Sequence, residues 1–243
     1  MKVHCLSTGR VREKRGARGA RRYLPGGWRR DTRPVNVFAV EHPDGVCVFD
    51  TGQTARAARR GYFAWWYPFF RLARFELRPE DEAAAQLRRR GVDPAAVRWV
   101  VMSHLHTDHA GGLSGFVRAT LVVSREEWHR ARGAGGRLRG YVPLDWPSGG
   151  PVVFAEDHPD LAGDGTLTVL ATPGHTPGHV SLLVRDRARS LLLGGDADPF
   201  DDAIAELCVR EGATFLGTHD DGACAEVAAA SAAAARDSEA AGP

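Results

Sequence analysis

The sequence predicts a layered α/β fold, on three observations. Short apolar runs rich in valine, leucine and phenylalanine recur along the chain, helical segments separate several of them, and polar residues follow a number of the runs. Alternating strands and helices favour sheets that are covered by helices. With 243 residues, 43% of them hydrophobic, the chain is long enough to form one large domain with a substantial core.

Strands are predicted first at 34–41 and 45–51, which the hairpin turn signal HPDG joins. The later predicted strands are 97–102, 120–123, 151–154, 166–171, 179–185, 190–194 and 213–217.

Helices are predicted at 80–90, 124–132 and 201–211. In the first, acidic residues lead and arginines trail, which complements the helix dipole, and Gly91 ends it. The second opens with Ser124 and carries Glu127 three residues later, the pattern of a capping box. The Ala-rich tail 225–243 is expected to be a helix that frays into disorder, with little apolar bulk to anchor it.

The charge is nearly balanced overall but uneven locally. A formal net charge of +2 is no global signal for nucleic acid, and none is expected as a partner. From Arg10 to Arg33, however, there are ten basic residues and two acidic ones. This Gly-rich stretch is interpreted as a solvated arm, or as an arm that folds over a site or contacts an anionic partner.

The cysteine spacing and the apolar runs indicate in which cellular compartment the protein is expected. Cys5, Cys47, Cys208 and Cys224 lack C-x-x-C spacing, which argues against a zinc ribbon, a redox pair or a disulfide framework. No signal-peptide core opens the chain and no apolar run is long enough to span a membrane, so a cytoplasmic location is expected.

One aromatic cluster, residues 62–70, follows neither helical nor strand periodicity. It is consistent with ordinary core or loop packing, with a pocket for an acyl chain, or with a homodimer face.

The most specific feature is an H-x-H-x-D-H run formed by His104, His106, Asp108 and His109. In extended backbone the two residues of H-x-H point the same way, so both imidazoles can meet one ion. A tight turn at Asp108 and His109 would aim these donors at a second ion. Such nitrogen and oxygen donors suit Zn, Fe, Co or Mn.

Three isolated polar residues follow apolar runs further along the chain, namely His175, Asp196 and His219. This recurrence predicts that several strands deliver one donor each to a common edge. His179 competes with His175 for the ligand role, and His175 is the choice made here. Seven donors suffice for two divalent ions that share a carboxylate, and such a pair forms a hydrolytic site.

These residues resemble the metallo-β-lactamase fold superfamily. The matching segments are VFDTG (48–52), SHLHTDHAGGL (103–113), TPGHTPGHVSL (172–182), LLLGGDA (191–197) and FLGTHD (215–220). The resemblance implies a four-layer αβ/βα sandwich with the site at one edge. It implies that His104, His106 and His175 bind one metal ion, that Asp108, His109 and His219 bind the other, and that Asp196 bridges them. It also implies that Asp50 supports a ligand.

Within the superfamily, the sequence is most similar to the N-acyl homoserine lactonase-like branch, through FAVEHPDGVCVFDTG (38–52), LRRRGVDPAAVRWVVMSHLHTDHAGG (87–112) and VVSREEWHRA (122–131). That branch usually carries a tyrosine shortly after the bridging aspartate, whereas here the residues are Ala197-Asp198-Pro199-Phe200. The segment between Asp196 and His219 is also shorter than is usual there. Tyr62, Tyr67 and Tyr141 are the candidates to replace the missing phenol.

We therefore expect a dinuclear metal-dependent hydrolase that opens a lactone by attack of a metal-bound hydroxide, with Asp108 protonating the departing alkoxide. The expected division is an N-terminal strand and basic arm at 1–33, a hydrolase domain at 34–224 and the tail at 225–243. The alternatives are hydrolysis of another ester or a thioester, and a catalytically weakened metal-binding relative.

Overall fold

The strands form two sheets in the computed structural model, which describes residues 1–13, 27–59, 61–63, 73–133, 135–136, 140–141, 151–186 and 189–240, the last nine by their backbone alone. The larger sheet has the order β4 (Ala73–Glu76), β1 (Lys2–Glu13), β2 (Arg33–His42), β3 (Gly45–Phe49), β5 (Val97–Val101), β6 (Thr120–Val123) and β7 (Val152–Phe154). The smaller sheet has the order β11 (Ala213–Gly217), β10 (Arg189–Gly195), β9 (Val180–Asp186) and β8 (Leu167–Ala171).

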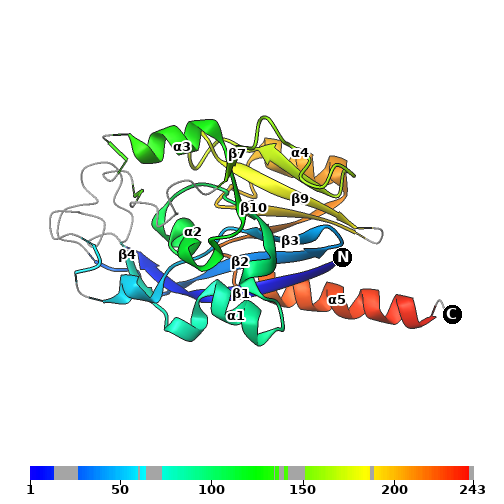
Figure 1. Ribbon diagram of the computed structural model, residues 1–243, viewed down its shortest axis with the longest axis horizontal. Helices are drawn as coiled ribbons and strands as arrows, with labels where there is room; N and C mark the ends of the chain where they lie inside the picture. Colours follow the sequence, from blue (N-terminus) through cyan, green and yellow to red (C-terminus); the bar gives the residue numbers. More distant parts are fainter. Residues whose placement is uncertain are drawn as a thin grey trace.

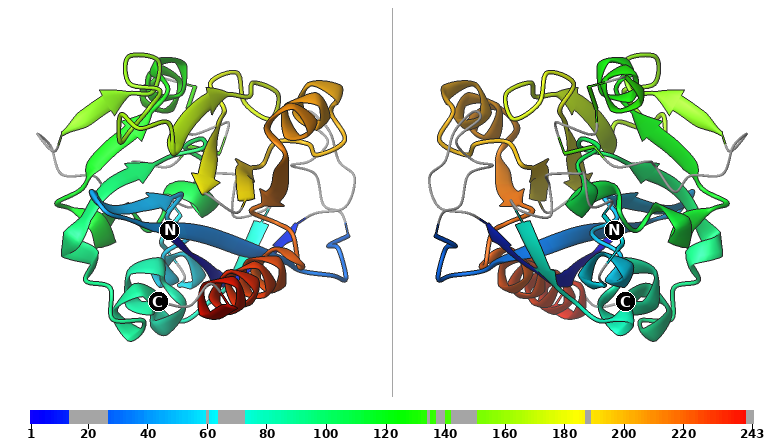
Figure 2. Two further views of the ribbon diagram at one scale, coloured as in Figure 1. Left: turned by 90° about the vertical axis from the view of Figure 1, so that its right-hand side faces the viewer. Right: turned by 90° about the vertical axis from the view of Figure 1, so that its left-hand side faces the viewer.

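Helices lie outside the two sheets (Figures 1 and 2). They are α1 (Ala83–Arg89), α2 (Thr107–Ala110), α3 (Arg125–Arg132), α4 (Asp202–Glu211) and α5 (Ala223–Ala240). Short 3₁₀ segments lie at Ala55–Ala58, Pro79–Asp81, Pro94–Ala96 and Leu113–Phe116. In both figures α4 lies on one side of the strands and α1 and α5 lie on the other.

The buried side chains define the layers. Between the sheets, Phe38 and Phe49 of the larger sheet pack with Leu182 and Leu193 of the smaller one. Neighbouring residues point outward because side chains alternate along a strand. On the outer faces, Val48 packs with Leu87 of α1. Leu183 and Leu192 pack with Ile204 and Leu207 of α4. The predicted αβ/βα sandwich is thereby confirmed.

The predicted elements are found with small shifts at their ends. Each of the nine predicted strands lies within two residues of an observed one, and β4 was not predicted. The predicted helix at 80–90 is shorter, because Pro79–Asp81 forms a separate 3₁₀ turn before α1. Gly91 ends it as expected, with a φ of +80° that favours glycine.

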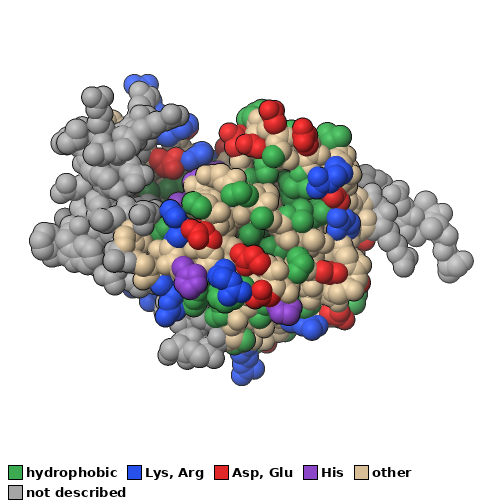
Figure 3. Space-filling model, turned by 90° about the horizontal axis from the view of Figure 1, so that it is seen from above, with side chains coloured by type: hydrophobic (Ala, Val, Ile, Leu, Met, Phe, Trp, Pro, Cys, Tyr) green, Lys and Arg blue, Asp and Glu red, His purple; other side chains and the backbone are tan. Residues whose placement is uncertain are grey.

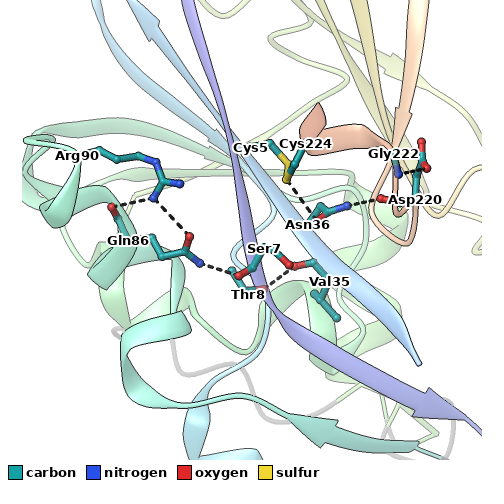
Figure 4. Close-up of a disulfide and its surroundings, with 10 residues drawn as sticks. All are labelled: Cys5, Ser7, Thr8, Val35, Asn36, Gln86, Arg90, Asp220, Gly222 and Cys224. Carbon is teal, nitrogen blue, oxygen red and sulfur yellow. Dashed lines mark hydrogen bonds between the residues drawn. A yellow bond between two sulfur atoms is a disulfide. The ribbon is translucent and has the colours of Figure 1, made fainter. Parts of the chain in front are cut away.

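The structure contains a disulfide between Cys5 of β1 and Cys224 of α5, which the cysteine spacing did not predict (Figure 4). The two residues are 219 positions apart in sequence, so only the packing of α5 against β1 brings them together. Cys47 and Cys208 are free thiols. The C-terminal helix is also better anchored than predicted, because Val227 is buried in the same hydrophobic cluster as Val3 of β1 and Leu216 of β11.

Several predictions fall on residues that are not described. Most of the 62–70 aromatic cluster, including Tyr67, lies outside the described residues, as do positions 14–26 of the basic arm. The division at 33/34 and 224/225 stays a prediction, while β1 is an inner strand of the larger sheet, between β4 and β2. Within the described part of the chain, no helix has both the length and the apolar character needed to cross a membrane.

Candidate metal centre

Strand direction brings the predicted site residues to one edge of the sandwich. β3 and β5 are parallel, β10 and β11 are parallel, and β8 and β10 both run antiparallel to β9. The carboxyl ends of β3, β5, β8, β10 and β11 are followed in turn by Asp50, the 104–109 run, His175, Asp196 and His219. The expected common edge is therefore present, and interactions among these side chains link them into one cluster.

The first set of donors comprises His104, His106 and His175. His104 Nε2 lies 3.0 Å from His106 Nδ1, and His175 Nε2 lies 3.1 Å from that same atom. Asp196 Oδ2 is 3.4 Å from His175 Nε2. Three imidazole nitrogens therefore converge beside one carboxylate oxygen.

The second set comprises Asp108, His109 and His219. His219 Nε2 lies 3.5 Å from Asp108 Oδ2 and 3.5 Å from Asp196 Oδ1. His109 Nε2 lies 3.4 Å from Asp196 Oδ1. Asp196 thus directs one carboxylate oxygen at each set of donors.

The donors fit a pair of cations. His109 Nε2 and Asp196 Oδ1 are buried without a hydrogen-bond partner, which is costly for polar atoms unless another group satisfies them. Three groups of residues could each hold a metal ion, because the possible ligand atoms within each group all lie within 4.8 Å of one another. The groups are His104, His106 and His175; His104, His109 and Asp196; and Asp108, His109 and His219. Imidazole nitrogens and carboxylate oxygens are ligands that zinc and similar divalent ions accept.

Asp50 orients His109 from outside the cluster. It has a φ of +60°, a strained conformation for a residue other than glycine, directly after β3. Its Oδ1 accepts the backbone N–H of Ser103 at 2.8 Å, and its Oδ2 lies 2.8 Å from His109 Nδ1. Because the carboxylate engages Nδ1, the other ring nitrogen of His109 is left to face the cluster.

A backbone carbonyl performs the same task for His219. His219 Nδ1 donates to Pro34 O at 2.7 Å, which leaves Nε2 directed at Asp108 and Asp196. Histidine ligands of metals are generally held this way through their second nitrogen.

His179 stands beside the cluster as a support. The backbone N–H of Asp196 donates to His179 Nε2 at 3.3 Å, and Thr172 Oγ1 lies 2.9 Å from His179 Nδ1. Gly195 leaves room for this approach, because a Cβ there would lie 3.0 Å from His179 Nε2 and 2.6 Å from Ser103 Cβ. The structure therefore brings His175, not His179, into the group of converging donors.

The electrostatics favour uncharged rings at His104 and His106 and ionised carboxylates at Asp108 and Asp196. Burial lowers the pKa of His104 and brings that of His106 to about 4. Burial opposes ionisation of Asp108, but the hydrogen bond with His219 and the charge of His109 outweigh it and lower its pKa to about 2. The pKa of Asp196 is lowered in the same way, with His109 and His219 overcoming burial. Deprotonated ligands are the form that binds metals.

A cavity of about 1270 Å³ opens onto the cluster. Its lining includes His175, Asp196 and His219 together with Glu13 and Arg33. Figure 3 views the molecule from the side of α3 and α4 and shows a hollow where acidic, basic and histidine side chains lie close together. A substrate can therefore reach the donors from solvent.

Of the three candidates for the missing phenol, Tyr67 lies outside the described residues, and Tyr62 and Tyr141 have other surroundings. Phe200, in the segment after Asp196, is 91% exposed. Tyr62 packs against an apolar cluster around Val11 and Phe75. The Tyr141 ring lies 5.1 Å from that of His106, and burial and the charge of Glu127 raise the pKa of its hydroxyl.

Comparisons with known proteins agree with this geometry. Residues 30–230 match the family model of the metallo-beta-lactamase superfamily, and the chain belongs to that superfamily. The N-acyl homoserine lactonase AttM of Azorhizobium caulinodans is 38% identical over 181 residues, covering 68% of this chain and 65% of that protein. The AttM lactonase of Rhizobium radiobacter is 39% identical over 176 residues, with the same coverage. The match thus spans 65% of these relatives' length, which is less than two thirds.

Solved structures show the same fold. An N-acyl homoserine lactone hydrolase with the product N-hexanoyl-L-homoserine at its catalytic metal centre aligns with a TM-score of 0.68 and 24% identity, over 90% of this chain and 93% of that one. The dizinc quorum-quenching lactonase AidC aligns with a TM-score of 0.56 and 16% identity, over 83% and 74%.

Sequence reasoning missed several supporting groups. It gave no role to Ser103 or to the carbonyl of Pro34, and it interpreted Glu127 only as a helix cap. The position of Ser103 directly before the H-x-H run was the one available signal for it. A backbone carbonyl 185 positions from His219 leaves no signal in the sequence.

Proposed function

We propose that this chain is a metal-dependent hydrolase that opens the ring of N-acyl homoserine lactones. The position of Asp196 between two sets of donors carries the reaction class, because a shared carboxylate is what a pair of hydrolytic ions requires. The substrate class rests on identities of 37–39% with N-acyl homoserine lactonases.

In this proposal His104, His106 and His175 hold one ion, Asp108, His109 and His219 hold the second, and Asp196 contacts both. Zinc is the proposed metal, although iron, cobalt and manganese also suit these donors. When bound, such a pair lowers the pKa of water to about 7 and polarises an ester carbonyl.

The residues of the chain have further tasks. The cavity admits the lactone beside His175, Asp196 and His219. Asp50 and Pro34 keep the ring nitrogens of His109 and His219 turned toward the cluster. Asp108 lies within this cluster as an ionised carboxylate. We assign it to accept a proton from the attacking water and to pass that proton to the departing alkoxide.

The test is a ring-opening assay on the purified protein loaded with Zn²⁺ or Co²⁺, using acyl homoserine lactones of several chain lengths and simple lactones. We expect acid release by the loaded protein, and loss of it after chelation or in His106→Ala. Metal-loaded protein that binds two ions per chain yet opens none of these rings would refute the substrate class and leave the metal centre standing.

A second candidate is a metal-binding relative that hydrolyses another ester or a thioester, or that has weakened catalysis. The observation that favours it is the absence of a tyrosine in Ala197-Asp198-Pro199-Phe200, since loss of one oxyanion donor costs on the order of 10²–10³ in turnover. A panel of thioesters and acyclic esters, assayed beside the lactones, separates these possibilities.

The compartment and the assembly remain predictions. Cytoplasmic location was predicted from the sequence, and the Cys5–Cys224 disulfide is the observation against it, since such bonds persist mainly in oxidising compartments. Cell fractionation tests the cytoplasmic location. Sedimentation of the purified protein tests whether it forms the predicted homodimer.

A further inference from the structure

The first turn of α3 contacts two loops that carry donors of the candidate metal centre. One loop is the H-x-H run after β5, and the other is the TPGHTPGH segment between β8 and β9. The contacts come from Ser124, which caps the helix, and from Glu127 three residues later. This turn is therefore placed to hold both loops at once.

Glu127 departs from its predicted local role. In a capping box its carboxylate would accept the backbone N–H of Ser124. Instead, Glu127 Oε1 accepts the backbone N–H of Leu105 at 3.1 Å. Leu105 stands between His104 and His106, so this bond fixes the peptide that sets the spacing of the two imidazoles.

The environment of this carboxylate makes the bond strong. Glu127 is fully buried, and its second oxygen lies in the interior without a hydrogen-bond partner. Burying a carboxylate is costly unless polar contacts compensate for lost water. Hydrogen bonds to a charged acceptor are about twice as strong as those between neutral groups. The bond from the Leu105 N–H therefore gives this buried carboxylate a polar contact and holds the loop in place.

Ser124 attaches the same helical turn to the second loop. Its hydroxyl donates to Gly178 O at 2.5 Å and accepts the backbone N–H of Glu127 at 3.1 Å. Gly178 is in close contact with the helix, because a Cβ there would lie 2.5 Å from Glu127 N. The first turn of α3 therefore holds both the loop that carries His175 and the loop that carries His104 and His106.

We propose that Glu127 is a positioning residue for the metal centre, holding His104 and His106 in register through the backbone of Leu105. The proposal rests on the proposed function, because it assumes that these histidines bind a metal ion. Glu127 itself contacts neither the ion nor the substrate; it acts through the loop.

The test compares Glu127→Ala and Glu127→Gln with Glu126→Ala, a matched control. Glu126 is the neighbouring carboxylate on α3, exposed, and paired with Arg130 at 3.2 Å. Three quantities are measured for each variant: Co²⁺ affinity and stoichiometry by calorimetry, the visible spectrum of the Co²⁺ form, and the melting temperature of the metal-free protein.

For Glu127→Ala we expect Co²⁺ affinity to fall about 10–100-fold with an altered Co²⁺ spectrum, as is typical when a group that orients metal ligands is removed. Glu127→Gln keeps an oxygen acceptor for Leu105 and should recover part of the affinity, including in a case where the alanine variant fails to fold. Glu126→Ala should match the wild type.

Suppose that both Glu127 variants keep wild-type Co²⁺ affinity and spectrum and only the melting temperature falls. Glu127 would then stabilise the fold without positioning the ligands, which would overturn this inference but leave the proposed function standing. A wild-type protein that binds no Co²⁺ or Zn²⁺ would overturn the proposed function and, with it, this role for Glu127.

Discussion

The two halves of the donor cluster are built on differently secured parts of the chain. His104 and His106 lie on a buried loop. Its backbone N–H groups at Ser103 and Leu105 donate to the carboxylates of Asp50 and Glu127, and Ser103 Oγ lies 3.0 Å from His104 Nδ1. His219 sits on a loop between β11 and α5 that is tied to the opposite end of the sequence. The loop of His104 and His106 is thus held by noncovalent contacts alone, whereas the loop of His219 lies next to a covalent cross-link between the two ends of the chain.

The contacts around His219 come from β1 and β2. Asn36 N donates to Thr218 O at 2.9 Å, and Asn36 Nδ2 donates to Asp220 O at 2.7 Å. Five residues after His219, Cys224 forms the disulfide with Cys5, and its sulfur also lies 3.8 Å from Asn36 Oδ1 (Figure 4). The loop of His219 is therefore held by Asn36 of β2 and, through the disulfide, by Cys5 of β1.

Asp196 joins the two halves, so its replacement should have the largest effect. In Asp196→Asn one charged oxygen becomes an amide nitrogen that repels cations, and turnover should fall by at least about 10²–10³-fold. Initial rates of lactone opening and the metal content per chain measure this. Normal rates with two ions bound would mean that the halves act independently.

Asp50→Asn tests the comparison by weakening only the set of donors formed by Asp108, His109 and His219. The amide can still accept the Ser103 N–H through one oxygen, but His109 Nδ1 loses its carboxylate partner. We expect affinity for one ion of the pair to fall about 10–100-fold and the other to change little. Stepwise Co²⁺ titration distinguishes this result from an equal loss at both positions, which would contradict the division into halves.

Removing the disulfide should have the smallest effect on the centre and a clear effect on stability. A cross-link of this span contributes about 2–4 kcal/mol, so the melting temperature of Cys5→Ser/Cys224→Ser should fall by about 5–15 °C. Metal affinity at 25 °C should stay near wild type, since Pro34 and Asn36 still hold the His219 loop.

Two measurements accompany that double variant. Calorimetric melting gives the stability change, and thiol titration of the denatured wild type should find two free thiols before reduction and four after it. Four thiols without reduction would contradict the bond. A large loss of metal affinity in the variant would show that the cross-link, more than the hydrogen bonds, secures His219.

Much of the site was predictable because its residues follow strands in a recurring pattern. Parallel strand ends meet at one sheet edge, so an apolar run followed by His175, Asp196 or His219 carries positional information. His104, His106, Asp108 and His109 are local in sequence and needed no tertiary knowledge. The pattern alone allowed either His175 or His179 as the ligand, and His175 was chosen. The structure places His175 among the converging donors, while His179 Nε2 accepts the backbone N–H of Asp196.

The supporting groups were not predictable in this way. Glu127 satisfied a local capping rule, and nothing in the sequence reveals that its carboxylate turns toward Leu105, 22 positions earlier. The Cys5–Cys224 bond depends on α5 packing against β1, which no spacing rule detects. The tail at 225–243 was predicted to have little apolar bulk to anchor it, yet Val227 is buried in a hydrophobic cluster with residues of β1 and β11.

The sequence by itself determined the layered class, nearly all of the strands, and the identity of the seven candidate donors, because periodicity and short motifs are local properties. Only the tertiary structure decided which oxygen of Asp196 faces which histidines, what orients each ring, and how the chain ends are joined. Those features depend on contacts between residues far apart in sequence, and such contacts exist only after the two sheets have packed together.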